Sequence, residues 1–220
     1  KTLLDSYFIE CHSENIVDTT KLLFTKLRDF YGINVEEDVL ILSSQKKGIS
    51  GTYNINKEIQ SITRKSESIE DGVIRKIDNS VFFIGDPVIQ LVNDYDNDVF
   101  NGEIGHVADI NKAEKIVYVD FGNEELIEYK NAGLSEINLA YAITYHKSQG
   151  SEFKHTAVVL DANALQLLSK ELIYTAITRA KKAVSLLAAP SALAAAMTVK
   201  TARRSGLSSQ IAQKLGTLCQ

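Results

Sequence analysis

The amino-acid sequence predicts an α/β fold, in which a mostly parallel sheet is flanked by helices and is interrupted by a small inserted β-barrel. Residues 39–42 are continuously apolar, as expected of a strand that is buried on both faces of a parallel sheet. Apolar residues recur at steps of three and four over residues 16–30, which indicates an amphipathic helix. Between residues 80 and 139 short strand-like segments are separated by turn formers, a pattern typical of a small barrel.

The first α/β part is expected to contain two strands and two helices. Side-chain oxygens at residues 13–15 can accept the free backbone N–H groups at the start of the first helix. Gly32 is suited to end that helix. The other elements of this part are strands at residues 7–12 and 38–44 and a helix at residues 52–62.

The insert and the second α/β part follow. Asn101-Gly102 and Gly122-Asn123 predict hairpin turns, because both residue types favour positive φ. The expected strands of the insert cover residues 81–84, 88–93, 105–110, 115–120 and 125–129. The α/β pattern resumes with strands at residues 140–144, 156–160 and 183–188, a helix at 169–181 and an alanine-rich helix after Pro190. We therefore predict one α/β domain over residues 1–79 and 140–202, an insert over residues 80–139 and a tail over residues 203–220.

The net charge of −4 gives no reason by itself to expect a nucleic-acid partner. The charge is unevenly distributed, because residues 1–139 hold 14 Lys and Arg against 25 Asp and Glu, whereas residues 140–220 hold 10 against 3. An anion would bind in the basic part. A solvated basic surface without a ligand explains the charge equally well.

Two features of the sequence indicate the cellular compartment of the protein: its cysteines and its lack of long apolar runs. Cys11 and Cys219 lie at opposite ends of the chain and have neither a zinc-ligand spacing nor a disulfide pattern. No apolar run approaches the roughly 20 residues of a membrane span, and residues 1–10 lack the layout of a signal peptide. We expect a soluble, cytoplasmic protein without a membrane partner or a metal site of its own.

Residues 140–153 run from an apolar strand into a polar loop, and ligands in open α/β sheets bind at loops that follow the carboxyl ends of strands. The loop offers hydroxyl, imidazole and ammonium donors suited to phosphate oxygens. These donors belong to Thr144, His146, Lys147 and Ser148. Gly150 would allow the backbone to approach an anion, and the Glu152 carboxylate can accept a hydrogen bond from a ribose hydroxyl. A polar surface connection without a ligand is the alternative.

Two further segments carry basic residues in a regular setting. Residues 171–182 have a helical pattern whose apolar stripe leaves Arg179 displayed on the polar face. In residues 42–51 an apolar strand is followed by Lys46-Lys47-Gly48. The alternatives are a solvated arginine on an amphipathic helix and a basic surface turn.

The three segments closely resemble motifs of the RecD-like superfamily 1 DNA helicases, the group of the exodeoxyribonuclease V alpha subunit and the TraA proteins. Residues 42–51, 140–153 and 171–182 are similar to motifs IV, V and VI, in the order of the family. Residues 85–105 look like the SH3-like barrel of these helicases. The resemblance covers nearly the whole chain and implies the C-terminal, second RecA-like domain of an ATP-dependent 5′→3′ helicase of DNA recombination and repair.

The resemblance also implies roles for individual residues. Arg179 would be the catalytic residue, an arginine finger at the γ-phosphate, because a guanidinium stays charged and can bridge two phosphate oxygens. The implied ATP contacts are Lys47, Gln149, Gly150, Glu152 and Arg179. The implied contacts with single-stranded DNA are Thr144, His146, Lys147 and Ser148, with Asn101, mainly a hairpin residue, or Tyr95 from the barrel. Lys47 departs from the family pattern, since many relatives have arginine in this pair and lysine lacks the bidentate fork.

No Gly-x-x-x-x-Gly-Lys-Ser/Thr sequence occurs in the 220 residues, so the backbone cradle for the β-phosphate and the magnesium-binding hydroxyl are missing. We therefore expect the chain alone to be inactive, with ATP and Mg²⁺ held mainly by a separate N-terminal RecA-like domain. Residues 117–120 and 158–161 look like acidic Walker B strands, but neither is assigned to magnesium.

The expected partners are single-stranded DNA, the N-terminal RecA-like domain and other subunits of a recombination nuclease complex. Two alternatives stay open. One is a non-enzymatic DNA-binding or partner-docking module that keeps the helicase fold. The other is an unrelated nucleotide-binding α/β enzyme, which would bind ATP tightly with these 220 residues alone.

Overall fold

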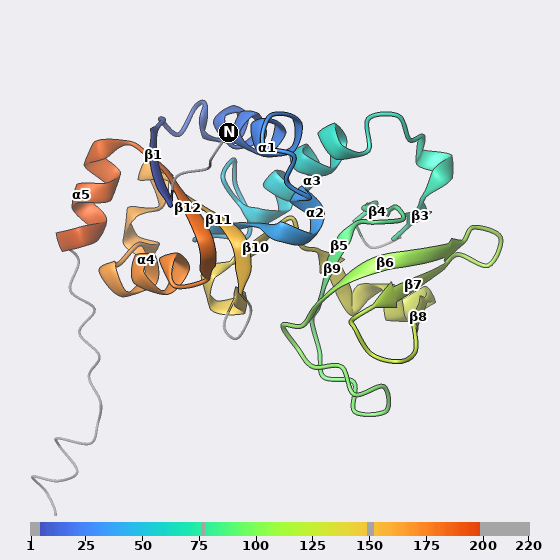
Figure 1. The fold of residues 1–220 in the computed structure, drawn as a ribbon. Helices are drawn as coiled ribbons and strands as arrows, with labels where there is room; N and C mark the ends of the chain where they lie inside the picture. The colour runs from blue at the N-terminus through green and yellow to red at the C-terminus, as the bar shows by residue number, and fades with distance from the viewer. Residues whose placement is uncertain (1–4, 76–77, 149–151, 199–220) are drawn as a thin grey trace, which may run out of the picture.

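A five-stranded parallel sheet, here called the main sheet, organises the larger part of the molecule. The structure, a computed structural model, describes residues 5–75, 78–148 and 152–198 (Figure 1). The strands lie in the order β1-β12-β11-β2-β10, and all neighbours are parallel. Their bounds are β1 Ser6–Glu10, β2 Val39–Ser43, β10 Ala142–Thr144, β11 Phe153–Leu160 and β12 Ala180–Ala188.

Helices cover both faces of the main sheet (Figure 1). On β2, Val39 and Ile41 belong to the hydrophobic cluster that includes α1 and α3, whereas Leu40 and Leu42 belong to the cluster that includes α4 and α5. Full burial of each such side chain contributes about 1.5–3 kcal/mol. This two-sided burial explains the continuously apolar run in the sequence. The helices are α1 Ile16–Asp29, α2 Val35–Asp38, α3 Thr52–Thr63, α4 Lys170–Ile177 and α5 Pro190–Thr198.

A second, antiparallel sheet, here called the insert sheet, has the strand order β8-β7-β6-β5-β9. Its core is continuous with the cluster beneath α1 and α3. A short hairpin, β3 with β4, lies between α3 and this sheet in the chain. The bounds are β3 Val73–Ile74, β4 Val81–Phe82, β5 Pro87–Gln90, β6 Ile104–Asn111, β7 Ile116–Asp120, β8 Ile127–Lys130 and β9 Ile137–Leu139. Four 3₁₀ helices complete the described elements: η1 Ile69–Asp71, η2 Asn131–Ser135, η3 Tyr145–Ser148 and η4 Ala162–Leu167.

Two glycines turn the chain between strands of the insert sheet. Gly102 has φ +101° in the connection from β5 to β6, and Gly122 has φ +86° in the connection from β7 to β8. These turns agree with the hairpin prediction. Positive φ is confined to the glycine of each pair, whereas the prediction assigned it to the asparagines as well.

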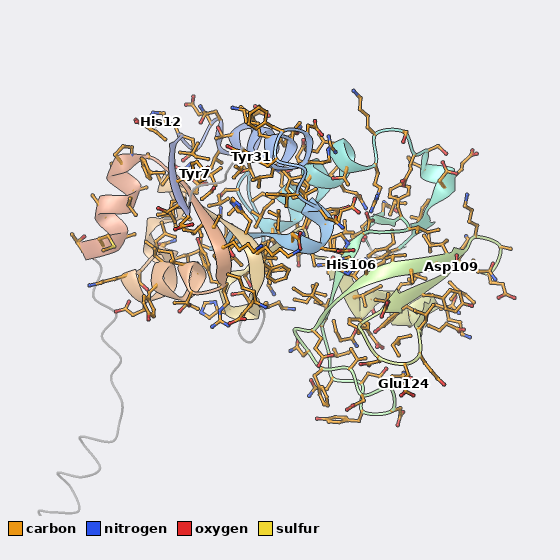
Figure 2. All side chains as sticks on the ribbon, in the orientation of Figure 1. Tyr7, His12, Tyr31, His106, Asp109 and Glu124 are labelled. Atoms are coloured by element: carbon orange, nitrogen blue, oxygen red, sulfur yellow. The ribbon has the colours of Figure 1, made fainter. Side chains whose placement is uncertain are left out.

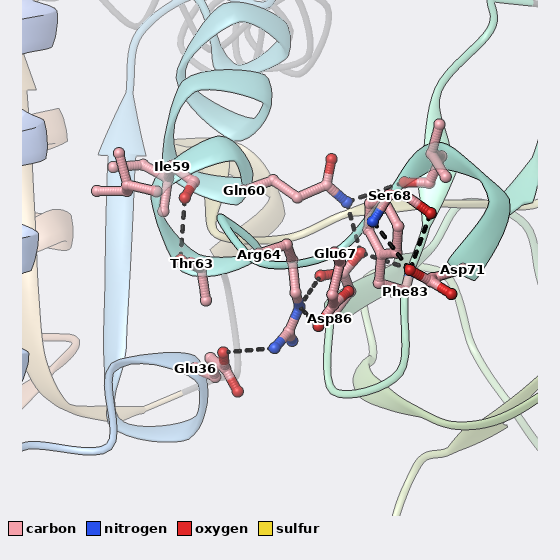
Figure 3. A network of polar contacts seen from close by, with 12 residues as sticks. Glu36, Ile59, Gln60, Thr63, Arg64, Glu67, Ser68, Asp71, Phe83 and Asp86 are labelled. Carbon is pink, nitrogen blue, oxygen red and sulfur yellow. Dashed lines mark hydrogen bonds and ion pairs between the residues drawn. The ribbon is translucent and has the colours of Figure 1, made fainter.

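A buried carboxylate, Asp86, joins the insert to α3 (Figure 3). Asp86 is 0% exposed and accepts hydrogen bonds from Tyr141 Oη at 2.8 Å, Arg64 Nε at 3.0 Å, Gln60 Nε2 at 2.5 Å and the Phe83 backbone N–H at 2.9 Å. Burial raises the pKa of Asp86, while these donors and the Arg64 charge act against that rise. The carboxylate is thus matched by donors from both parts of the molecule.

Glu36 of α2 adds a second connection between the two parts. Its carboxylate lies 3.0 Å from Arg64 Nη1, and its backbone oxygen lies 3.1 Å from Nε2 of His106 on β6. Figure 2 shows His106 where the two parts of the molecule meet. The insert is therefore held against the main sheet by polar contacts as well as by the shared core.

The helix predicted to carry Arg179 is shorter than expected. It was predicted over residues 169–181, but α4 ends at Ile177 and β12 already begins at Ala180. The reason is that Ala180 pairs with Phe153 of β11, which extends the strand into the end of the predicted helix. Arg179 is consequently not on a helix face but in the turn before β12, where it is half-buried.

A similar difference affects the strand expected at residues 140–144. In the structure it is shortened at its start to β10, Ala142–Thr144, and the chain before it, Ile137–Leu139, forms β9 of the insert sheet. No helix among the described residues is long and apolar enough to cross a membrane.

His155 predicts how stability depends on pH. Its side chain is 1% exposed on β11, with Nε2 3.0 Å from Ser185 Oγ, and burial lowers its pKa to about 4 from the ordinary 6.5. The folded state thus favours the neutral imidazole. The contribution of His155 to the free energy of unfolding is therefore complete above pH 6.5 and is lost as pH falls towards 4. Between pH 7 and pH 5 we expect a loss of about 2 kcal/mol in unfolding free energy from this group.

Urea denaturation at the two pH values measures this loss. His155→Leu should reduce the difference between pH 7 and pH 5 by about that amount, whereas His12→Leu, at an exposed position, should leave it unchanged. An equal pH difference in the original protein and in His155→Leu would contradict the assignment.

Candidate functional site

The carboxyl edge of the main sheet gathers the predicted nucleic-acid residues of the loop at 144–148. Thr144 ends β10 and lies opposite Ser43, which ends β2. The two loops that follow these strands, η3 and the turn at residues 44–51, therefore emerge side by side. The edge lies where ligands of open α/β sheets bind.

The turn at residues 44–51 has a fixed backbone. Ser43 Oγ donates to the Ser50 backbone oxygen at 2.6 Å, and Gln45 Nε2 donates to Ser50 Oγ at 2.9 Å. Gly48 has φ +91°, and a Cβ on Gly51 would lie 2.5 Å from backbone atoms of Lys47, so both positions require glycine. The turn holds Lys46 and Lys47 exposed at the edge of the sheet.

A cavity of about 230 Å³ opens between this turn, β10 and the insert. Lys46, Thr144 and Lys147 are among its polar lining residues, together with Thr52 and Tyr53 at the start of α3. Burial, and then the neighbouring charge of Lys46, lower the pKa of Lys147. Two like charges that share a partly buried cavity would be stabilised by an anion between them.

The remaining predicted DNA residues lie in different surroundings. His146 is exposed, whereas Ser148 is 0% exposed and donates to the Tyr145 backbone oxygen at 2.7 Å, which stabilises the turn of η3. Asn101 is exposed in the loop from β5 to β6. A Cβ added to the adjacent Gly102 would lie 3.8 Å from the Lys147 carbonyl oxygen, so this loop approaches η3.

Two predicted ATP residues come together at the opposite, amino edge of the main sheet. The Phe153 N–H donates to the Arg179 carbonyl oxygen at 2.9 Å, which places Glu152 beside the turn that carries Arg179. Glu152 forms an exposed ion pair of 3.3 Å with Lys181. Arg179 Nε is buried and has no hydrogen-bond partner among the described residues.

The other predicted ATP residues are not placed with this pair. Gln149 and Gly150 lie outside the described residues. Lys47 follows the carboxyl end of β2, whereas Arg179 precedes the amino end of β12. The five residues of β2 alone span roughly 16 Å at about 3.3 Å per residue. Lys47 therefore lies with the cations of the carboxyl edge.

Asp161, one of the two Walker B-like aspartates of the sequence, is occupied by the protein itself. Its carboxylate accepts hydrogen bonds from Ser13 Oγ, from Ser50 Oγ at 2.5 Å and from the Asn163 N–H at 2.9 Å. Although burial raises the pKa of Asp161, these bonds hold it below its ordinary value. Within the part of the chain that the structure describes, no group of three metal-ligating side chains is present.

Family models match two segments of the chain. The model of the SH3 domain of ATP-dependent RecD-like DNA helicases matches residues 55–121, and the model of the UvrD-like helicase C-terminal domain matches residues 139–187. Both models describe domains of DNA helicases, and the first is specific to the RecD-like group. The predicted fold class, a parallel sheet flanked by helices with an SH3-like insert, is confirmed. The insert bounds of 80–139 stay a prediction, because the first match begins inside α3.

Named relatives agree with this family. The chain is 36% identical over 146 residues to the ATP-dependent RecD2 DNA helicase of Deinococcus radiodurans, covering 65% of this chain and 19% of the relative. It is 33% identical over 169 residues to the RecBCD enzyme subunit RecD of Haemophilus influenzae, covering 77% of this chain and 24% of the relative. The chain thus spans about a fifth to a quarter of the length of these relatives.

A solved structure supports the fold. The Pif1 helicase from Bacteroides, in complex with ADP-AlF3 and single-stranded DNA, aligns with a TM-score of 0.50 and 17% identity, covering 79% of this chain and 47% of that one. At this identity the similarity concerns the fold alone.

The shared cavity of Lys46 and Lys147 gives a direct prediction. Lys46→Ala should raise the pKa of Lys147 part of the way to its ordinary value, because the repelling charge is removed while burial remains. An NMR titration that follows the Lys147 Cε resonance measures this change. Lys47→Ala serves as the matched control and should leave the Lys147 pKa unaltered. A Lys147 pKa that does not respond to Lys46→Ala would show that the two ammonium groups do not share the cavity.

Proposed function

We propose that this chain is the second motor domain, with its SH3-like insert, of an ATP-dependent 5′→3′ DNA helicase that acts in recombination and repair. The observation that carries the proposal is the buried Nε of Arg179, which has no hydrogen-bond partner in the part of the chain that the structure describes. Buried polar groups in native proteins nearly always have a partner, so a guanidinium nitrogen that finds no acceptor among the described residues is suited to bind an acceptor on a ligand. A phosphate oxygen is the acceptor that an arginine fork fits best.

The amino edge fits ATP bound by a second domain. Arg179 would hold a phosphate oxygen and stabilise the charge on the transferred phosphoryl group, and the nearby Glu152 carboxylate would accept a ribose hydroxyl. Gln149 and Gly150 would complete these contacts. ATP supplies the phosphoryl group, and Mg²⁺ would be held mainly by the domain that carries the phosphate-binding loop.

The carboxyl edge fits the backbone of single-stranded DNA. Lys46, Lys147 and Thr144 face one cavity there, and His146 is exposed beside it. Cations and hydroxyls are the groups that proteins use for phosphate contacts. The exposed Lys47, on the same turn as Lys46, is assigned to this edge, and Asn101 approaches it from the insert.

The fold connects the two edges. Tyr145 packs in one hydrophobic cluster with Ile173 and Ala176 of α4, the helix that leads to Arg179. Tyr145 also precedes His146 and Lys147 in η3, and its hydroxyl donates to the Val159 backbone oxygen at 3.0 Å. A shift of α4 on nucleotide binding would therefore reach the DNA residues through a single packed side chain.

We extend the proposal to partners and location. The relatives named as RecBCD subunits support assembly with other subunits of a recombination nuclease complex. Because the proposed substrate is DNA, we also propose a cytoplasmic location.

Arg179→Ala tests the nucleotide edge in a protein that joins this chain to a domain with a phosphate-binding loop. We expect DNA-stimulated ATP hydrolysis to fall about 10³-fold or more, which is the usual contribution of an arginine finger, while affinity for single-stranded DNA is retained. Arg179→Lys should recover little activity, because lysine lacks the fork. Lys182→Ala, at an exposed cation of β12, is the control. Hydrolysis that is unchanged in Arg179→Ala would exclude the assignment and favour the binding-module alternative.

Lys147→Ala tests the DNA edge in the 220-residue chain. Loss of one phosphate contact should weaken binding of oligo-dT. It should also make the negative slope of log K against log salt concentration less steep by about 0.7. Fluorescence anisotropy at several salt concentrations measures both quantities. Lys154→Ala, which removes an exposed cation at the amino edge, should change neither. Equal slopes for Lys147→Ala and the original protein would rule out the contact.

A further inference from the structure

The cavity at the carboxyl edge continues into a second one of about 760 Å³. Both cavities are bounded by α3 on one side and by the insert on the other. They share Tyr53, Asn56, Leu91, Asn138 and Leu139. Together they form one groove, here called the α3 groove, which runs from Lys46 and Lys147 along α3 to η1 and the β3-β4 hairpin. Figure 1 shows α3 beside this part of the insert.

The α3 groove has a fixed floor. Asn56 donates to the backbone oxygens of Leu139 at 3.0 Å and of Ala142 at 2.9 Å, and it accepts the Ala142 N–H at 2.7 Å. Gln60 donates to the Val81 backbone oxygen at 2.9 Å. Both side chains are almost fully buried, so the distance between α3 and the insert is set before any ligand binds.

Tyr53 and Lys57 stand above this floor on the outer face of α3. They are one helical turn apart, so their side chains are neighbours. Tyr53 is 50% exposed, and Lys57 is exposed with no ion pair among the described residues. Arg75, at the far end of the groove, is instead engaged by Asp78, Asn138 and the Ile137 backbone oxygen. The groove thus offers one free aromatic face between Lys46 and Lys147 at one end and Lys57 along its wall.

Tyr95, the most exposed aromatic among the described residues of the insert, has the opposite electrostatic setting. Tyr95 is 77% exposed, but the cavity beside it is lined by Asp94, Asp96 and Glu136. Carboxylates repel a phosphate backbone, so Tyr95 is poorly suited to a DNA contact. Tyr53, by contrast, combines an exposed ring with cations, which are the two requirements of a site for single-stranded nucleic acid.

We infer that Tyr53 is a base-stacking platform for single-stranded DNA. The DNA passes from the cavity of Lys46 and Lys147 into the α3 groove, where Lys57 lies beside the phosphate backbone of the DNA. The inference rests on the proposed DNA-binding edge and extends it by a stacking site on α3. Stacking tolerates any base, because every base has a π face. The site would therefore grip DNA without reading its sequence.

The test compares Tyr53→Ala, Tyr53→Phe and Tyr95→Ala in the 220-residue chain. The probes are fluorescein-labelled oligo-dT and an oligonucleotide of equal length with abasic sites, and the readout is anisotropy. Tyr53→Ala should weaken oligo-dT binding about 5- to 100-fold, in line with the loss of one stacked base. It should leave both the abasic affinity and the salt slope unchanged, because no phosphate contact is lost. Tyr53→Phe keeps the ring and should bind as the original protein does, as should Tyr95→Ala.

The outcomes separate this inference from the proposed function. Equal affinity of Tyr53→Ala and the original protein for oligo-dT, or an equal loss on both probes, would overturn stacking. If Lys147→Ala weakens binding while Tyr53→Ala does not, the DNA edge stands and the platform fails. Absence of oligo-dT binding by the original chain would overturn both. A thermal melt of each variant by circular dichroism excludes misfolding as the cause of a loss.

Discussion

The α3 groove and the cavity at the carboxyl edge depend on one buried carboxylate. An ionised group taken out of water costs several kcal/mol unless it is paired and fully hydrogen-bonded. Asp86 meets this demand with four donors: Gln60 lies in α3 and Arg64 directly after it, Tyr141 lies in the segment before β10, and the Phe83 N–H belongs to the insert itself. These bonds form together only when α3, β10 and the insert adopt one arrangement. The walls of the α3 groove therefore follow from satisfying Asp86.

Local sequence patterns were sufficient to predict those elements whose burial shows in their own run of residues. The apolar run of β2 and the periodicity of α1 predict the layers of the main sheet, because a strand buried on both faces and a helix buried on one have different patterns. The end of α4 was missed for the opposite reason. Residues 178–181 continue the helical pattern, but the pairing of Ala180 with Phe153 is a contact between distant segments, which leaves no local trace.

The candidate site was predictable in residue types but not in arrangement. Thr144 and Lys147 stand out as donors after an apolar strand, whereas the separation of Lys47 from Arg179 depends on the strand order of the main sheet, with β11 between β2 and β12. The sequence does contain a pattern that places Tyr53 on the surface of α3. Ile55 and Ile59 fill the inner face of α3, which leaves Tyr53 and Lys57 outside as an aromatic and a cation one turn apart. The insert that completes the groove is remote in sequence, so this pattern alone does not predict a binding groove.

Asp161 has a consequence for which substitutions the carboxyl edge tolerates. Its carboxylate ties the loop after β1, through Ser13, and the turn after β2, through Ser50, to the end of β11. The cations on that turn point outward and can exchange for other cations without disturbing the fold. A larger or apolar side chain at either serine would release the turn and displace the charges that it carries. Selection on this edge should therefore fall hardest on two small hydroxyl side chains that lie away from the cavity.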